Sequence, residues 1–183
     1  MVQFYKPNAK MTGSACQFYL NYNDGTFFST LIKQASWDAS KKTGSFQANK
    51  DDPSKNVIIK LNQSEVAGFI DALERNVEFK GYHSSSQQVV QFSFGPYMRN
   101  EEQVGFSYSV SKQGKEDSTQ KGSFLMGLYF NEAVLLRNHL DFLLNKSFEI
   151  QEQKVLESTN KARYNKSETR PQPQNNDDEE DIW

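Results

Sequence analysis

The stretch that decides the fold is "NVIIKLNQSEVAGFIDALERN", residues 56–76, in which one hydrophobic period gives way to another. Residues 56–61 form a short apolar run rich in β-branched residues, which is typical of a strand. After Asn62 or Ser64, either of which can cap a helix, four apolar residues recur at helical spacing: Val66, Phe69, Ile70 and Leu73. The stretch therefore predicts a strand that runs directly into a helix near residues 62–75.

The same order recurs in "GLYFNEAVLLRNHLDFL", residues 127–143. This second helix is expected near residues 131–145, with an apolar stripe that we assign to Val134, Leu135, Asn138, Phe142 and their neighbours. A short echo supports two repeats, since "GSF" occurs at 44–46 and again at 122–124, ahead of each strand-to-helix junction.

Strands are expected before each helix. Those of the first repeat cover 14–22, 26–37, 44–50 and 56–61, with a hairpin turn at Asn23–Gly25. Those of the second cover 87–98, 103–112 and 121–130. Within 103–112 one face is apolar through Val104, Phe106, Tyr108 and Val110. The sequence therefore predicts an α+β fold, with antiparallel sheets of about seven or eight strands and two helices, in two strands-then-helix repeats.

The last part of the chain differs in composition. From about Gln151 it is rich in Gln, Asn, Ser, Lys and Glu, and it ends "DDEEDIW". Residues 1–150 are expected to form the folded domain and 151–183 a linker and tail, disordered from about residue 160, with 151–159 free to extend the second helix. The net charge of the whole chain is −2. Since residues 171–183 hold five acids and no base, residues 1–170 carry a net charge of +3.

The sequence contains few residues in patterns that support catalysis. His83 and His139 are the two histidines and Cys16 the single cysteine, with no partner pattern for nucleophilic catalysis and no zinc spacing. No glycine-rich phosphate loop is present, and no run of 18 apolar residues predicts a membrane span. The sequence predicts a binding protein that is not an enzyme, with no cofactor and no metal. The lone cysteine favours an intracellular setting, the cytoplasm or nucleoid.

Basic residues alternate with aromatic ones on the predicted strands and loops. A single-strand binder needs both, because cations follow the phosphates while flat rings stack on bases, at roughly 1–3 kcal/mol per base. The candidate single-stranded DNA contacts are Lys33, Trp37, Lys41, Lys42, Phe46, Lys50, Lys80, Tyr82, His83, Tyr97, Arg99 and Lys112. Most phenylalanines must be core residues, and for Trp37, Tyr82 and Tyr97 packing at the edge of the core is the competing interpretation.

The tail resembles the C-termini of bacterial and bacteriophage single-stranded DNA-binding proteins, which are acidic and end in a hydrophobic or aromatic residue. The matching residues are Asp177, Asp178, Glu179, Glu180, Asp181, Ile182 and Trp183. The resemblance implies that this segment docks on replication and repair partners and competes with DNA for the basic surface. A phage-encoded protein of this type would act in the host cytoplasm.

The body resembles a different group. Proteins of the bacterial type usually have an OB-fold barrel, which remains an alternative here. Two strands-then-helix repeats are instead similar to the Whirly family of single-strand binders. The Whirly motif "KGKAAL" is absent, and "KGSFLM" at 121–126 is only a loose echo, so no residue role is transferred from it.

Together these features predict sequence-independent binding of single-stranded DNA in replication, recombination and repair, by a protein that self-associates and recruits partners through its tail. Two alternatives remain open. One is a protein-interaction adaptor or scaffold that does not bind nucleic acid, and the other is a DNA-binding transcription regulator.

Overall fold

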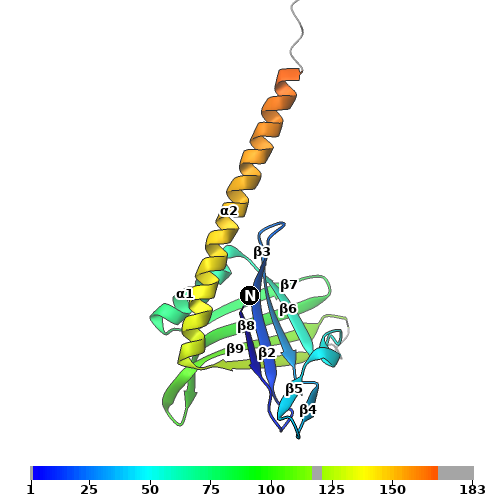
Figure 1. Ribbon diagram of the computed structural model, residues 1–183, viewed down its shortest axis with the longest axis vertical. Helices are drawn as coiled ribbons and strands as arrows, with labels where there is room; N and C mark the ends of the chain where they lie inside the picture. Colours follow the sequence, from blue (N-terminus) through cyan, green and yellow to red (C-terminus); the bar gives the residue numbers. More distant parts are fainter. Residues whose placement is uncertain (1, 117–120, 169–183) are drawn as a thin grey trace, which may run out of the picture.

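The computed structural model describes residues 2–116 and 121–168, which form ten strands, two α-helices and one 3₁₀ turn (Figure 1). The first repeat contains β1 (Val2–Lys6), β2 (Ser14–Asn21), β3 (Thr26–Lys33), β4 (Ser36–Asp38), β5 (Thr43–Ser45), the 3₁₀ turn (Gln47–Asn49), β6 (Asn56–Leu61) and α1 (Gln63–Arg75). The second contains β7 (Phe79–Ser84), β8 (Gln88–Arg99), β9 (Glu102–Gly114), β10 (Gly122–Leu128) and α2 (Phe130–Glu168).

The strands form two antiparallel four-stranded sheets and a small ribbon. The first sheet has the order β1-β2-β3-β6, the second has the order β10-β9-β8-β7, and β4 pairs with β5. The predicted α+β class and the two strands-then-helix repeats are confirmed. The described strands do not close into a barrel, so the OB-fold alternative is wrong. Two strands, β1 and β7, were not predicted; β7 includes three of the candidate contact residues, Lys80, Tyr82 and His83.

Helix α1 begins and ends as its sequence predicts. The Asn62 side chain accepts from the Glu65 backbone N–H at 2.9 Å, and the Glu65 carboxylate accepts from the Asn62 N–H at 2.9 Å. This reciprocal capping box fixes the first turn. Asn76 ends the helix in the left-handed conformation, at φ 56°. The predicted face is the buried one, since Val66 and Phe69 are fully buried and Ile70 and Leu73 pack against the core.

Helix α2 differs from the prediction in its buried face. The core contacts come from Ala133, Leu136, Leu140 and Leu143. The residues assigned to the stripe point outward instead: Val134, Leu135 and Phe142 are 62%, 51% and 50% exposed, and Asn138 is exposed too. The reason is that α2 is apolar on two faces, so periodicity alone cannot select the one that packs on the sheets.

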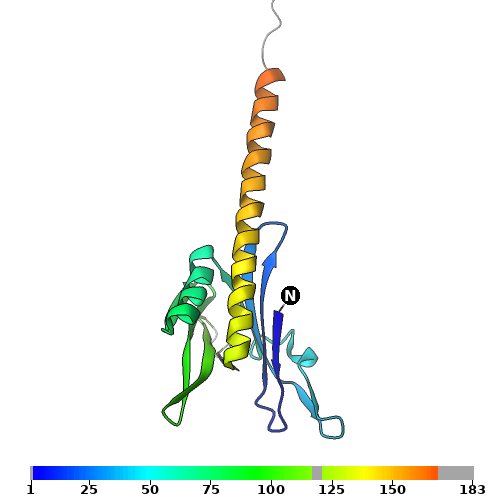
Figure 2. The same ribbon diagram turned by 60° about the vertical axis from the view of Figure 1, so that its left-hand side comes forward.

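Helix α2 is also longer than expected. It continues to Glu168, beyond the body of the molecule, where disorder was expected from about residue 160 (Figures 1 and 2). The segment "QEQKVLE" is poor in apolar residues, but its Glu, Gln, Lys and Leu residues are good helix formers, so it extends the helix. The acidic tail, residues 177–183, lies outside the described residues. Within the described chain, no helix has both the length and the apolar character needed to cross a membrane.

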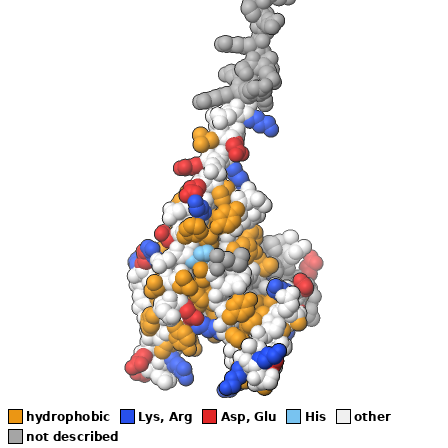
Figure 3. Space-filling view, viewed as in Figure 1, with side chains coloured by type: hydrophobic (Ala, Val, Ile, Leu, Met, Phe, Trp, Pro, Cys, Tyr) orange, Lys and Arg blue, Asp and Glu red, His pale blue; other side chains and the backbone are white. Residues whose placement is uncertain are grey.

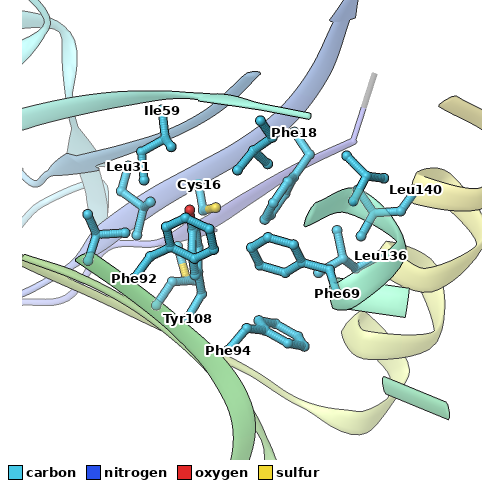
Figure 4. Close-up of a cluster of buried hydrophobic side chains, with 14 of the residues drawn as sticks. Cys16, Phe18, Leu31, Ile59, Phe69, Phe92, Phe94, Tyr108, Leu136 and Leu140 are labelled. Atoms are coloured by element: carbon cyan, nitrogen blue, oxygen red, sulfur yellow. The ribbon is translucent and has the colours of Figure 1, made fainter. Parts of the chain in front are cut away.

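The core lies between the inner faces of the two sheets and beneath both helices (Figure 4). Phe69 of α1 is at its centre, with its ring centroid 5.2–5.7 Å from those of five other rings: Phe18, Phe79, Phe92, Phe94 and Tyr108. A buried hydrogen bond of 2.7 Å joins the Ser29 hydroxyl in the first sheet to the Tyr108 hydroxyl in the second. These contacts fix the two sheets relative to each other, which leaves each sheet an outward face.

Candidate nucleic-acid interface

The outer face of the first sheet carries aromatic rings that the core does not use. Because side chains alternate along a strand, Tyr19 of β2 points away from the buried Phe18 and Leu20. The strand register places Tyr19, Phe28 and Lys60 in one row across β2, β3 and β6. The Tyr19 and Phe28 rings stack, with centroids 5.3 Å apart and planes at 20°. In this row the exposed ammonium group of Lys60 therefore lies next to the pair of stacked rings.

A second aromatic group lies on the same face. Tyr5 of β1 is 58% exposed, and its ring rests edge-on against Phe46, with centroids 5.3 Å apart. A groove of about 430 Å³ runs beside it and is bordered by Tyr19, Ile58 and Lys50. Tyr5 pairs with Ala15, four residues before Tyr19 on β2, so the two groups stand roughly 14 Å apart along the sheet.

Positive charge is concentrated in the same half of the chain. Residues 1–61 contain eight lysines and four acids, a net charge of +4, whereas residues 62–170 carry a net charge of −1. The exposed lysines of this half are Lys10, Lys41, Lys42, Lys50, Lys55 and Lys60. In Figure 3, basic side chains gather at the lower end of the molecule, where Figure 1 places the β4–β5 ribbon. The aromatic face therefore lies on the cationic side of the protein.

The outer face of the second sheet is of a different character. Its register places Lys80, Ser93 and Ser109 in one row and Tyr82, Gln91, Ser111 and Ser123 in the next. These residues line a hollow of about 470 Å³. Tyr82 is 60% exposed, but the Lys80 ammonium is 2.9 Å from the Glu78 carboxylate, which compensates its charge. This face offers hydroxyl and amide groups with little net charge.

The structure leaves several of the predicted contact residues accessible, though on separate surfaces. Lys41 and Lys42 are exposed in the β4–β5 turn, and Trp37 is half-buried on β4. Lys50 lies at the groove of the first sheet, while Lys80 and Tyr82 lie on the second. The remaining accessible candidates, at the far end of β8, are Tyr97 and Arg99.

Other predicted contact residues point inward. Lys112 is 8% exposed, and its Nζ donates to the Pro53 carbonyl at 2.6 Å; burial lowers its pKa. The His83 Nε2 is 2.6 Å from the Glu65 carboxylate on α1, so the imidazole faces away from Tyr82. Phe46 is buried beneath Tyr5, and the Lys33 Nζ lies 5.0 Å from the Phe124 ring centroid. Lys112 and Phe46 are therefore buried, whereas His83 and Lys33 are half-buried and already contact other side chains.

The sequence prediction missed Tyr5, Tyr19, Phe28 and Lys60. A usable signal was present, since in "CQFYLN" and "TFFSTLIK" the residues between the buried positions include polar ones, which marks an outward face. Tyr19 and Phe28 looked like core residues because both neighbouring strands are aromatic. Tyr5 was missed along with its strand.

No protein-family model matches this sequence, and no curated protein does. Among solved structures, a clear likeness is found. The chain has the fold of WHY3 from Arabidopsis thaliana. The TM-score is 0.58 over 84% of this chain and 90% of the WHY3 chain, at 11% sequence identity. WHY3 is a Whirly protein, so the comparison supports the Whirly-like resemblance of the body and not the phage type.

Other kinds of site find no support in the described part of the chain. Nowhere in it do three or more His, Cys, Asp or Glu side chains gather into a metal site. His139 Nε2 lies 3.0 Å from the Phe18 carbonyl, and partial burial lowers the pKa of this imidazole, so it joins α2 to β2 as a neutral donor. The predicted partner-binding residues Asp177 to Trp183 lie outside the described residues. The outer face of the first sheet is therefore the best candidate interface.

Proposed function

We propose that this protein binds single-stranded DNA without sequence preference, along the outer face of the first sheet. The observation that carries the proposal is the Tyr19–Phe28 ring pair and the exposed Tyr5, flanked by Lys60 and Lys50 on the cationic half of the chain. It is a binding protein and not an enzyme.

The chemistry of this face suits a single strand better than a duplex. Exposed rings stack on bases of any identity, and the bases of a duplex are already stacked on one another. Lysine ammonium groups neutralise phosphates without reading sequence. A β-sheet face also presents the rings on a rigid surface. The Whirly-like fold adds support, because the family resemblance of the body implies single-strand binding.

The proposal extends to biological role. Binding of this kind serves DNA replication, recombination and repair, and the segment Asp177 to Trp183 recruits the proteins of these processes. Self-association is also part of the proposal, because α2 leaves large apolar side chains exposed. An adaptor without nucleic-acid binding and a transcription regulator acting on duplex DNA are the competing functions, and the experiments below distinguish them.

Titration of the full chain with oligo-dT at several salt concentrations tests the central claim. We expect log K to fall linearly with log salt, with a slope no steeper than about −4, since six exposed lysines lie in the cationic half. A mixed-sequence strand should bind with similar affinity, and a duplex of equal length more weakly. Equal affinity for the duplex would favour the transcription regulator, and absence of binding to either would favour the adaptor.

Deletion of Asp177 to Trp183 is expected to strengthen oligo-dT binding by roughly 3–10-fold at low salt, and less at high salt, because it removes five carboxylates that are tethered to a chain whose residues 1–170 carry a net charge of +3. The single change Trp183→Ala should leave DNA affinity nearly unchanged but abolish capture of replication proteins, since it removes the apolar anchor and keeps the charge. Fluorescence anisotropy and pull-down measure the two effects. If neither variant changes either property, the tail serves only solubility.

A further inference from the structure

The exposed side of α2 carries six large apolar residues arranged symmetrically about Asn145. Phe142 and Phe148 lie three residues to either side of it, Leu135 and Val155 ten, and Val134 and Leu156 eleven. All six are between 46% and 63% exposed. The positions of the large apolar residues on this side are thus symmetric about Asn145, with Val134 matched by Leu156 and Leu135 by Val155.

We propose that two copies of this chain pair through this side of α2, antiparallel, with a two-fold axis at Asn145. Across this axis, a residue that precedes Asn145 by a given number of positions in one copy lies opposite the residue that follows Asn145 by the same number in the other. Val134 and Leu135 of one helix then lie against Val155 and Leu156 of the other. The four phenylalanines surround the two asparagines. The antiparallel pairing specifies the partner and the register of the self-association proposed above. This pairing does not depend on DNA binding.

The geometry of the molecule permits this pairing. Residues 130–149 of α2 contact the body through Ala133, Leu136, Leu140 and Leu143, on the opposite side of the helix. Beyond Ile150 the helix projects free of the body (Figures 1 and 2). The free half of one helix can therefore lie along the outward side of the packed half of the other. Figure 3 shows apolar side chains exposed along this helix.

The phenylalanines are the largest part of the available surface. Aromatic side chains can bury 150–250 Å², so the two half-exposed phenylalanines of each copy offer roughly 100 Å² apiece, about 400 Å² in the pair. The exposed Val and Leu side chains and the polar residues between them supply the rest of an interface, for which the lower end of the specific range is about 1,200 Å². Two-fold pairing buries the same patch on both copies, so the pair is closed and does not extend into a filament.

The charged residues near the axis have partners within each chain. The Asp141 carboxylate lies 3.9 Å from Arg137 Nη1, whose guanidinium also pairs with Glu74, and the Glu149 carboxylate accepts from Lys146 Nζ at 2.7 Å. In this register Asp141 of one copy lies opposite Glu149 of the other, so these cations must offset the repulsion between the two carboxylates. A polar residue at the centre of a helix pair also fixes its register, which is the role that Asn145 takes here.

Single cysteine substitutions test the register directly in the full chain. In the antiparallel pair Asn145 meets its own copy, whereas Asn138 lies about 21 Å from its copy and opposite Glu152. A disulfide requires Cα atoms within about 7 Å. Under mild oxidation, Asn145→Cys should give a covalent dimer. Asn138→Cys and Glu152→Cys should each give none alone, but a dimer when mixed. The wild type is the background control, because its one cysteine, Cys16, is buried.

Analytical ultracentrifugation supplies the second measurement. The wild type should be a dimer without DNA, and the double variant Phe142→Asp, Phe148→Asp should be a folded monomer by circular dichroism, since both rings are solvent-exposed in the single chain. The proposal is overturned if Asn138→Cys cross-links to itself as readily as Asn145→Cys, which indicates a parallel pair. It is equally overturned if the wild type is monomeric, or if the double variant remains dimeric.

Discussion

The double variant Tyr5→Ala, Tyr19→Ala is expected to bind oligo-dT at least about 30-fold more weakly than the wild type. Each stacked base contributes roughly 1–3 kcal/mol, so the loss of two stacking positions should cost about 2–6 kcal/mol. Both rings lie on the outer face of the first sheet, where Tyr5 is 58% exposed and Tyr19 stacks on Phe28. Fluorescence anisotropy at fixed salt measures the change, and the salt dependence should keep its slope because no lysine is altered.

Tyr82→Ala is the matched control. It removes the same type of side chain at nearly the same exposure, 60%, but from the second sheet. We expect its effect on oligo-dT affinity to be small. A large loss in Tyr82→Ala together with an unchanged Tyr5, Tyr19 variant would place the DNA on the second sheet. Thermal denaturation of all variants shows whether any loss of binding arises from loss of fold.

Phe69→Ala is expected to destabilise the protein more than any surface change. Truncation of a buried phenylalanine typically costs about 3–5 kcal/mol, against a total folding stability of about 5–15 kcal/mol. Phe69 is fully buried, and its ring contacts rings from both sheets, namely Phe18 of β2 and Phe92, Phe94 and Tyr108 of β8 and β9. Its removal therefore leaves a cavity where α1 and both sheets meet.

Denaturant titration followed by circular dichroism measures this loss. Ile58→Ala serves as the comparison, because Ile58 is an apolar residue that is 53% exposed on a strand of the same molecule. Its change should stay within about 0.5 kcal/mol. A loss below about 1 kcal/mol in Phe69→Ala would mean that the ring cluster is not the centre of the core.

Much of the fold follows from hydrophobic period alone. In β9 the alternation predicted which side is buried, and Phe106, Tyr108 and Val110 are buried as expected. The helix at 63–75 was predicted within a residue at each end, because Asn62 supplies a cap and its apolar residues occupy one face. In both elements the pattern is unambiguous, since one face is apolar and the other is polar.

The predictions that were wrong concern segments whose hydrophobic pattern is compatible with more than one arrangement in the fold. Both faces of α2 are apolar, and the choice between them depends on which one the sheets contact. Tyr82 and His83 were both predicted to contact DNA, but they are neighbours on β7, and in a strand neighbouring side chains point to opposite faces. Lys112 follows Val110 by two residues on β9 and so shares its buried side, where its Nζ donates a hydrogen bond to the Pro53 carbonyl. Such tertiary partners are not visible in the sequence.

Under the proposed function, the projecting part of α2 is a spacer between the DNA-binding face and the tail that recruits partners. From Ile150, which packs beside Gly25 at the end of the first sheet, to Glu168 the helix rises about 27 Å. Eight residues separate Glu168 from Asp177, and even fully extended they span only about 29 Å. The first carboxylate of the tail can therefore reach back only to about the level of Gly25, at the end of the first sheet. Under the proposed function, a partner held by Trp183 and a DNA strand on the outer face of this sheet would accordingly be bound by one chain at the same time.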